Sequence, residues 1–590
     1  MEINCNGISI QLNKQIESFE TELTCKEISS GVFHVNYHFT CSEPTQLSDI
    51  KISWVLPSVD FHYKWNSQCM QNRALDAGLG TFNYIECRSS RQAPVYSLYN
   101  LEGTNALTFA LSDAIHDSRI GGTTENGFNY NCNITVNGTK IDPTSEYSLT
   151  LRLDFRKVPY YQCLQETSLW WESFPTYKPC KIPNEAKAPL ICSWYIYIVN
   201  VDQNDLLKQC ALAKKAGIDV MILDDGWQTN QLEFGYQNNG DWEVCKDKFP
   251  DFKSYVKQVQ DVGMKFLVWF SIPYVGIESK IYHKMKDYLL PAREGAKWFS
   301  FDPRYPEVRE YLSSKFENFV LEYGIDGLKM DFIGTFGCNS KDEEISKPGH
   351  DTISIGVAVC KLLDDVMKRL YAINPNILIE FRQEYVGPAM RKYGNMFRAV
   401  DCPNSIGDNR VRTIDTRLLS GNTAVHSDPI TWHKKDTVES AAMQLIHALF
   451  SVPQLSIKIS DLPADHSKML SHYLSFWKEN RQVLLEGELL PLYPNQLYPM
   501  VIAKDNQKCI VAFYANTPFE CKEHINKTLI IVNGTYKEEL LIDTEIDLGN
   551  FSTISYTCTG KQINEDNIQI SKGISKVKVP IAGQLILNRL

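Results

Sequence analysis

The sequence has no run of about 18 apolar residues, the length that a helix needs to cross a bilayer, so no membrane span is predicted. Its 17 cysteines include no Cys-x-x-Cys pair, and therefore neither a zinc site nor a disulfide framework is indicated. Positive charge is also scarce, with a net charge of −10 and a pI near 5.7. These values argue against a nucleic acid or an anionic membrane as partner.

Residues 1–6 lack a basic region followed by an apolar stretch, so no signal peptide is expected in this sequence. An odd number of scattered cysteines is more typical of a reducing compartment. Together these features favour the cytoplasm, and a periplasmic or secreted location fits if a signal was removed beforehand.

A chain of 590 residues is too long for one core, and about three to four domains are expected. Residues 1–175 contain alternating stretches such as 31–39 and 147–153, which predict a β-sandwich. In residues 176–488, short apolar strands alternate with amphipathic helices. Residues 489–590 return to β character and predict a C-terminal β-domain. The fold class is therefore multidomain, α/β plus all-β.

The middle region contains candidates for eight strands, at 190–194, 219–224, 265–269, 325–332, 377–381, 394–401, 422–426 and 454–459. Eight units in this length match a (β/α)₈ barrel. A doubly wound open sheet is the alternative, but no glycine-rich phosphate loop follows the first strand.

The strand at 325–332 carries Lys329 and Asp331, two positions apart. Side chains two apart on a strand share a face, so these two should project together. A carboxylate beside an ammonium stays ionised, ready to attack or to bind a polar ligand. A buried structural ion pair would give the same pattern, so this strand alone leaves both interpretations open.

Barrel enzymes place their catalytic groups at the C-terminal ends of the strands. The residues at those ends are Trp194, Asp224, Asp225, Trp269, Lys329, Asp331, Glu380, Arg382, Arg398 and Asp401. Two carboxylates on separate strands, with aromatic platforms between them, suit glycoside cleavage. Asp331 is the better nucleophile and Asp401 the candidate proton donor. Arg398 opposes that second role, so the surroundings must raise the pKa of Asp401.

Five motifs follow in order: Leu-Asp-Asp-Gly-Trp at 223–227, Gly-Asp-Trp at 240–242, Phe-Pro at 249–250, Gly-Met-Lys at 263–265 and Lys-Met-Asp at 329–331. Together they resemble the α-galactosidases of glycoside hydrolase family 36, in clan D, of which this chain would be a divergent member. The resemblance covers the barrel, and the predicted flanking β-domains also suit that family.

The resemblance implies that Asp331 is the nucleophile of a retaining double displacement and that Asp401 is the acid/base. Asp224 and Asp225 would hold O4 and O6 of a galactose-like ring, and Lys329 would lie near O3 and O4. Trp269 and Trp194 would line the sugar pocket. The implied partner is an oligosaccharide or glycoconjugate ending in an α-linked galactose-like sugar. No metal or organic cofactor is implied, and since the family often assembles, a homo-oligomer is allowed.

The chain departs from the family after the fifth strand, where a cysteine- and glycine-rich segment near the sugar 2-position is replaced by residues 380–388. Arg382, with Arg398 and Arg410, would make this side of the pocket cationic and select a 2-substituted or anionic sugar. Alternatively, these arginines pair with neighbouring carboxylates. Glu384 and Asp408 are further acid/base candidates, and Asp428 belongs either to the rim or to a helix cap.

The leading function is therefore an exo-acting retaining hydrolase of terminal α-galactosides or of related α-glycosides such as α-N-acetylgalactosaminides. One alternative is a transglycosylase of the raffinose-synthase kind, which uses the same two carboxylates. Another is a sugar-binding barrel without activity, although binding alone does not require both Asp331 and Asp401.

Overall fold

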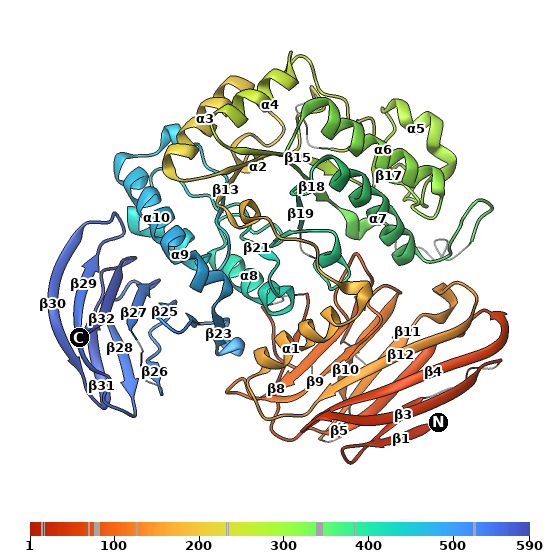
Figure 1. Ribbon diagram of the computed structural model, residues 1–590, viewed down its shortest axis with the longest axis horizontal. Coiled ribbons are helices and arrows are strands. Elements are labelled where there is room, and N and C mark those ends of the chain that lie inside the picture. The colour runs from red at the N-terminus through yellow and green to blue at the C-terminus, as the bar shows by residue number, and fades with distance from the viewer. Residues whose placement is uncertain are drawn as a thin grey trace.

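The computed structural model describes residues 1–12, 16, 18–68, 71–75, 83–125, 128–231, 233, 235–337, 346–382, 384–522, 525 and 527–590. Figure 1 shows three parts: an N-terminal β-sandwich in red and orange, a central α/β unit from yellow to cyan, and a C-terminal β-domain in blue. This arrangement confirms the predicted fold class. The boundaries at 175/176 and 488/489 remain a prediction.

The central unit is a barrel of eight parallel strands. In chain order they are β13 (Leu190–Cys192), β14 (Val220–Leu223), β15 (Lys265–Ser271), β18 (Gly327–Asp331), β19 (Leu378–Arg382), β20 (Met396–Arg398), β21 (Ala424–His426) and β22 (Gln454–Leu455). A parallel bridge between His426 and Val452 brings β21 beside the start of β22 and completes the ring. The strands are almost wholly buried, as parallel strands covered by helices must be.

The surrounding helices begin and end where their capping residues dictate. Asp202 accepts a hydrogen bond from the Asp205 amide at the start of α3, and Gly217 ends that helix with a φ of 102°. Pro306 opens α6, and Gly324 closes it in the left-handed region. The main barrel helices are α3 (Gln203–Ala216), α4 (Phe252–Asp261), α6 (Pro306–Tyr323), α7 (Ile355–Ile373), α8 (Ile406–Ser420), α9 (Val438–His447) and α10 (Ala464–Glu486). Shorter helices are α2 (Trp194–Tyr197) and α5 (Lys280–Met285).

Two six-stranded antiparallel sheets form the sandwich. The first holds β1 (Glu2–Cys5), β2 (Ile8–Leu12), β5 (Ile50–Pro57), β11 (Asn129–Val136), β10 (Ser118–Glu125) and β7 (Asn83–Cys87). The second holds β3 (Glu20–Ser29), β4 (Val32–Thr45), β12 (Thr144–Asp154), β9 (Asn105–Leu111), β8 (Val95–Tyr99) and β6 (Tyr63–Asn66). Alternate residues of both sheets meet in one core, where Trp54 and Phe109 pack edge to face.

A helix that the sequence pattern did not predict, α1 (Tyr160–Glu172), joins the sandwich to the barrel. Its buried face includes Thr167 and Ser168, which interrupt the apolar stripe that would identify a helix. Ser168 donates a hydrogen bond to the Leu419 carbonyl of α8, and Trp171 donates one to the Leu111 carbonyl of β9. The helix therefore contacts both parts.

The C-terminal domain contains a seven-stranded and a three-stranded sheet around a separate apolar core. The larger sheet holds β23 (Glu488–Leu492), β24 (Met500–Lys504), β25 (Lys508–Phe513), β27 (Thr528–Asn533), β32 (Gln584–Arg589), β29 (Gly549–Tyr556) and β30 (Gln562–Ile570). The smaller holds β26 (Phe519–Cys521), β28 (Glu539–Thr544) and β31 (Gly573–Lys578).

Asp415 of α8 links all three parts of the molecule. Its buried carboxylate accepts hydrogen bonds from Trp65 at 2.8 Å and Arg73 at 2.5 Å, both in the sandwich. A third comes from the Tyr498 hydroxyl, just before β24, at 2.5 Å, and Tyr160 of α1 donates to that same hydroxyl.

Among the described helices, none is long and apolar enough to cross a membrane.

A second contact joins the sandwich to the barrel close to the strand ends. Ser89 donates to the Gly356 carbonyl of α7, Arg88 donates to the Phe336 carbonyl, and Arg91 donates to the Gly334 carbonyl. Gly334 and Phe336 belong to the segment that follows β18, which includes the short helix η5 (Ile333–Thr335). The sandwich therefore braces the barrel loop directly after Asp331.

Candidate active site

Asp331 ends β18 at the carboxyl rim of the barrel and is only 5% exposed. Its Oδ1 accepts hydrogen bonds from the Tyr385 hydroxyl and the Phe332 amide, both at 2.8 Å, and its Oδ2 accepts one from Trp269 Nε1 at 3.0 Å. Burial raises the pKa of Asp331, but the charges of Arg382, Lys329 and Arg398 outweigh it, so the pKa lies well below its usual value. This carboxylate is therefore ionised and firmly oriented.

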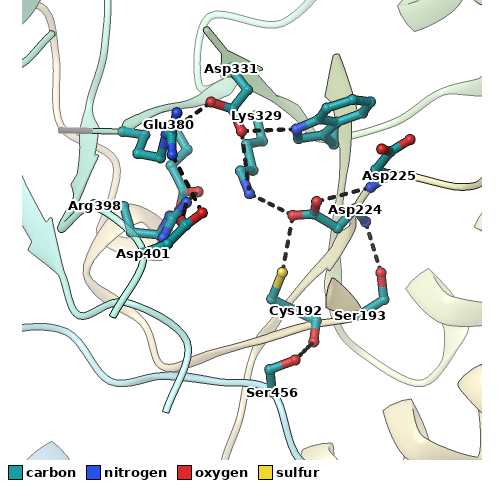
Figure 2. Close-up of polar contacts among 12 residues, drawn as sticks. Cys192, Ser193, Asp224, Asp225, Lys329, Asp331, Glu380, Arg398, Asp401 and Ser456 are labelled. Atoms are coloured by element: carbon teal, nitrogen blue, oxygen red, sulfur yellow. Dashed lines mark hydrogen bonds and ion pairs between the residues drawn. The ribbon is translucent and has the colours of Figure 1, made fainter. Parts of the chain in front are cut away.

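Lys329 shares the inner face of β18 with Asp331, as the sequence predicts, but its nearest partner lies just beyond the end of another strand, β14. Its Nζ donates to Asp224 Oδ2 at 2.5 Å and lies 3.9 Å from Asp331 Oδ2. Burial lowers the pKa of Lys329, but Asp224 more than offsets it and the pKa is raised. In Figure 2 the ammonium lies between the two aspartates. The Lys329–Asp224 ion pair therefore joins β18 to the end of β14.

Asp224 and Asp225 follow β14, and in Figure 2 the Asp224 carboxylate points towards Lys329 while that of Asp225 points away from it. Asp224 is held by the Cys192 thiol, the Asp225 amide and, through its own amide, the Ser193 hydroxyl (Figure 2). Asp225 Oδ1 accepts from Gln228 Nε2 at 2.7 Å, whereas its Oδ2 is buried without a hydrogen-bond partner. Burial raises the pKa of Asp225 to about 6. An unpartnered buried oxygen of this kind fits a hydroxyl of a bound ligand.

Arg382, at the end of β19, lies between the two candidate catalytic carboxylates. Its Nε is 3.1 Å from Asp331 Oδ1, and its Nη1 donates to Asp401 Oδ2 at 3.4 Å. The guanidinium also rests over the Phe332 ring, 5.0 Å from its centroid. Its side chain is 17% exposed, so Arg382 is the more accessible of the two predicted pocket arginines.

Asp401 follows β20, and its side chain is 46% exposed. Arg398 Nη2 donates to its Oδ1 at 2.9 Å, while Arg398 itself is buried and also pairs with Asp428. Burial raises the pKa of Asp401, but Arg398, Arg382 and Lys329 outweigh it, so the pKa lies below its usual value. The raised pKa that a proton donor needs is therefore not present in the free protein.

Asp428 and Glu380 are buried carboxylates that lie next to Arg398. Asp428 accepts from the Cys402 amide at 2.8 Å and from the Tyr195 hydroxyl at 3.1 Å, and burial raises its pKa to about 6. It therefore orients the Arg398 side chain and the Asp401 loop. Glu380 Oε2 accepts from Gln454 Nε2 at 3.0 Å, and burial raises its pKa to about 7.

Other predicted residues lie at or outside this pocket. Trp269 is buried at the pocket, and half-buried Trp194 begins α2 directly after β13. Arg410 points away: it donates to the Leu497 carbonyl and stacks on Tyr514, which corrects its grouping with Arg382. Asp408 lies in the first turn of α8, where Ser405 donates to it. Exposed Glu384 accepts from Gln92 of the sandwich.

Sequence reasoning missed Tyr385 and Phe332. Tyr385 lies in the segment compared with the family, but no spacing singles it out as a donor to Asp331. Phe332 has a φ of 64°, in the left-handed region, and this turn directs its amide onto Asp331. Neither feature is visible in a pattern of residue types. In the described part of the chain, no group of three or more His, Cys, Asp or Glu is arranged to hold a metal ion.

A closed (β/α)₈ barrel with acidic, cationic and aromatic side chains at the carboxyl ends of its strands has the architecture of a barrel enzyme. The chain belongs to the melibiase family, whose model matches residues 176–487. This match confirms the resemblance drawn from the motifs.

Similar proteins support the same placement. α-Galactosidase AgaA of Geobacillus stearothermophilus is 22% identical over 352 residues, which cover 56% of this chain and 47% of AgaA. α-Galactosidase Mel36A of Lactobacillus acidophilus is 27% identical over 162 residues, 26% of this chain and 21% of Mel36A. The matches thus span about half or less of these relatives. A structure of an AgaA variant with raffinose aligns with a TM-score of 0.65 and 15% identity, covering 99% of this chain and 82% of that one.

Proposed function

We propose that the protein is an exo-acting retaining glycosidase that removes terminal α-galactose, or a close relative such as α-N-acetylgalactosamine, from an oligosaccharide or glycoconjugate. One observation carries the proposal: Asp331 is buried, ionised and held by three hydrogen-bond donors at the barrel rim, where Asp401 shares the Arg382 guanidinium with it. The small exposure of Asp331 suits a pocket that admits one terminal ring.

In the proposed reaction, Asp331 attacks the anomeric carbon and forms a covalent glycosyl-enzyme ester. Asp401 gives its proton to the leaving oxygen and then removes one from the water that hydrolyses the ester. Because Arg398 and Arg382 favour the charged form of Asp401, the proton must be acquired when substrate occupies the pocket. Arg382 is the partner that substrate can displace, since its contact with Asp401 is the longer one.

The remaining predicted residues have binding roles in this proposal. Asp225 Oδ2, buried without a hydrogen-bond partner, would accept a sugar hydroxyl, and Asp224 with Lys329 would hold a second one. Trp269 would pack against the sugar ring, and Trp194, at the start of α2, would lie at the edge of the sugar site. Arg382 would contact the substituent at the sugar 2-position, while buried Arg398 would position Asp401.

The first test is a panel of aryl α-glycosides assayed with the wild type and Asp331→Asn. We expect turnover of α-galactosides or α-N-acetylgalactosaminides by the wild type and a loss of about 10³-fold or more in the variant. Azide added to Asp331→Ala should give the β-configured glycosyl azide, whereas Asp401→Ala should give the α-configured one. Activity towards none of the α-galactoside-like substrates would contradict the proposal and favour a binding protein. Sugar transfer in preference to hydrolysis would indicate a transglycosylase.

A further inference from the structure

Among the tryptophans that the structure describes, Trp298 is the most exposed, with 36% of its surface accessible. It lies on an antiparallel hairpin of β16 (Tyr274–Gly276) and β17 (Trp298–Ser300), whose long connection contains α5. The hairpin follows barrel strand β15. A tryptophan this accessible requires an explanation, because the other tryptophans that the structure describes are buried or half-buried.

The face of the hairpin that carries Trp298 turns towards the segment that follows Asp331. Successive residues of a strand face opposite sides, so Trp298 and Ser300 share a face and Phe299 takes the other. Phe299 stacks on Tyr282 of α5, at 5.5 Å between ring centroids. On the opposite face, Ser300 donates to the Thr335 carbonyl, close after Asp331 in the chain, at 3.4 Å.

A chain of ring contacts connects Trp298 to the candidate nucleophile. Trp298 packs at a right angle on Tyr236, with 5.5 Å between centroids. Tyr236 in turn stacks on Trp269 at 6.3 Å, and Trp269 donates its Nε1 hydrogen to Asp331. Tyr236 also contacts the Phe332 ring at 5.4 Å. Two aromatic side chains, Tyr236 and Trp269, therefore connect the exposed indole to buried Asp331.

The backbone fixes this platform in place. Gly276 donates its amide hydrogen to the Asn239 carbonyl at 2.8 Å, and Glu278 donates to the Gln237 carbonyl at 2.9 Å. Gly276 packs so tightly that a Cβ there would lie 2.0 Å from the Gln237 backbone. Trp298 is thus held against the Tyr236 loop before any ligand arrives, which lowers the entropic cost of binding.

We propose that Trp298 is the stacking platform for the leaving-group sugar, the ring joined to the galactose-like unit that occupies the buried pocket. The ligand class is an uncharged pyranose, whose apolar face packs on the indole. This inference rests on the proposed glycosidase function, and it assigns the second ring of the substrate to the β16–β17 hairpin.

The test compares raffinose, which has a leaving-group sugar, with α-galactosyl fluoride, which has none. For Trp298→Ala we expect kcat/KM for raffinose to fall about tenfold, mainly through KM, as loss of an aromatic contact worth about 1.4 kcal/mol predicts. The value for the fluoride should stay within about twofold. Trp298→Phe should recover part of the loss, and Tyr536→Ala, at an exposed aromatic of the C-terminal domain, should behave as wild type.

Equal losses on both substrates, or no loss on raffinose, would overturn the platform while leaving the glycosidase proposal intact. So would a change of oligomeric state in Trp298→Ala, because the indole would then belong to an interface between copies. If the wild type cleaves neither these two substrates nor an aryl α-N-acetylgalactosaminide, the glycosidase proposal fails instead. Raffinose binding by calorimetry then decides the platform: weaker binding by Trp298→Ala supports it, and unchanged binding overturns it.

Discussion

The Nε atom of Arg382 lies 3.1 Å from the Oδ1 atom of Asp331. The positive charge of Arg382 thus adjoins the carboxylate proposed to attack the sugar. The Nη1 atom of Arg382 also donates a hydrogen bond to Asp401. The same guanidinium favours the charged form of both carboxylates. Arg382 therefore keeps the proposed nucleophile Asp331 ionised and makes protonation of the proposed donor Asp401 less favourable.

Replacing Arg382 with Met removes this charge and keeps most of the side-chain length. The pKa of Asp401 should rise, because one of the cations that lowers it is gone. We expect the alkaline limb of the kcat/KM–pH profile to move up by about one unit. Arg382→Lys keeps a positive charge and should shift the limb less. An unchanged limb, or a shift to lower pH, would show that Arg382 does not control this proton.

Asp401→Ala should reveal the proton donor through its dependence on the leaving group. Cleavage of raffinose needs a proton on the leaving oxygen, so kcat/KM, which reports the step that releases the leaving group, should fall about 10²- to 10⁴-fold. α-Galactosyl fluoride needs little such help and should lose far less. Asp408→Ala and Glu384→Gln alter the other two acid/base candidates, whose contacts lie elsewhere, and should show no such selectivity. Equal losses on both substrates in Asp401→Ala would remove its assignment.

Glu380→Gln should change how stability depends on pH. Burial raises the pKa of Glu380 from 4.5 to about 7, so the folded state favours the protonated form. Its contribution to stability is fully present below pH 4.5 and is lost as the pH rises through about 7. Glutamine cannot ionise and can still accept from Gln454. Relative to wild type, the variant should gain on the order of 3 kcal/mol between pH 4.5 and pH 8, at ~1.36 kcal/mol per pKa unit.

Thermal unfolding from pH 4 to pH 8 measures this difference. The stabilities of the two proteins should differ least at pH 4. Titration of other buried carboxylates, such as Asp225 and Asp428, affects both proteins equally and so does not contribute to the difference. A constant difference across the range would mean that Glu380 does not titrate in this window.

Asp415→Asn should destabilise the whole molecule. The substitution leaves the Arg73 guanidinium buried without a counter-charge, which costs about 3–5 kcal/mol in comparable cases. Tyr498→Phe removes one hydrogen bond to the same carboxylate and should cost about 1 kcal/mol. The midpoint of thermal unfolding should therefore fall much further for Asp415→Asn than for Tyr498→Phe. Similar midpoints for the two variants would show that the charge pair contributes little.

The barrel was predictable because its strands are apolar and its helices amphipathic. For example, the predicted strand at 265–269 is observed as Lys265–Ser271, and the predicted strand at 377–381 as Leu378–Arg382. The rim residues followed from the rule that strand ends carry the chemistry. The helix α1 was missed because small polar residues occupy part of its buried face.

Contacts between strands distant in sequence were not predictable. The sequence places Lys329 beside Asp331, but its short ion pair is with Asp224, across the β14 and β18 strand ends. Arg410 has the same residue type as Arg382, yet α8 directs it towards the C-terminal domain. The turn at Phe332 and the hydroxyl of Tyr385 depend on backbone geometry that residue types do not specify.

The brace formed by Arg88, Ser89 and Arg91 extends the set of positions that can alter substrate choice. Arg88 and Arg91 bind the backbone just after Phe332, the ring on which Arg382 rests, and Ser89 binds the start of α7. A substitution in the sandwich would therefore displace the pocket wall without changing any residue that contacts sugar. We therefore expect substitutions at residues 88–92 of the β-sandwich to change substrate preference, and a search for variants with new preferences should include them together with the barrel loops.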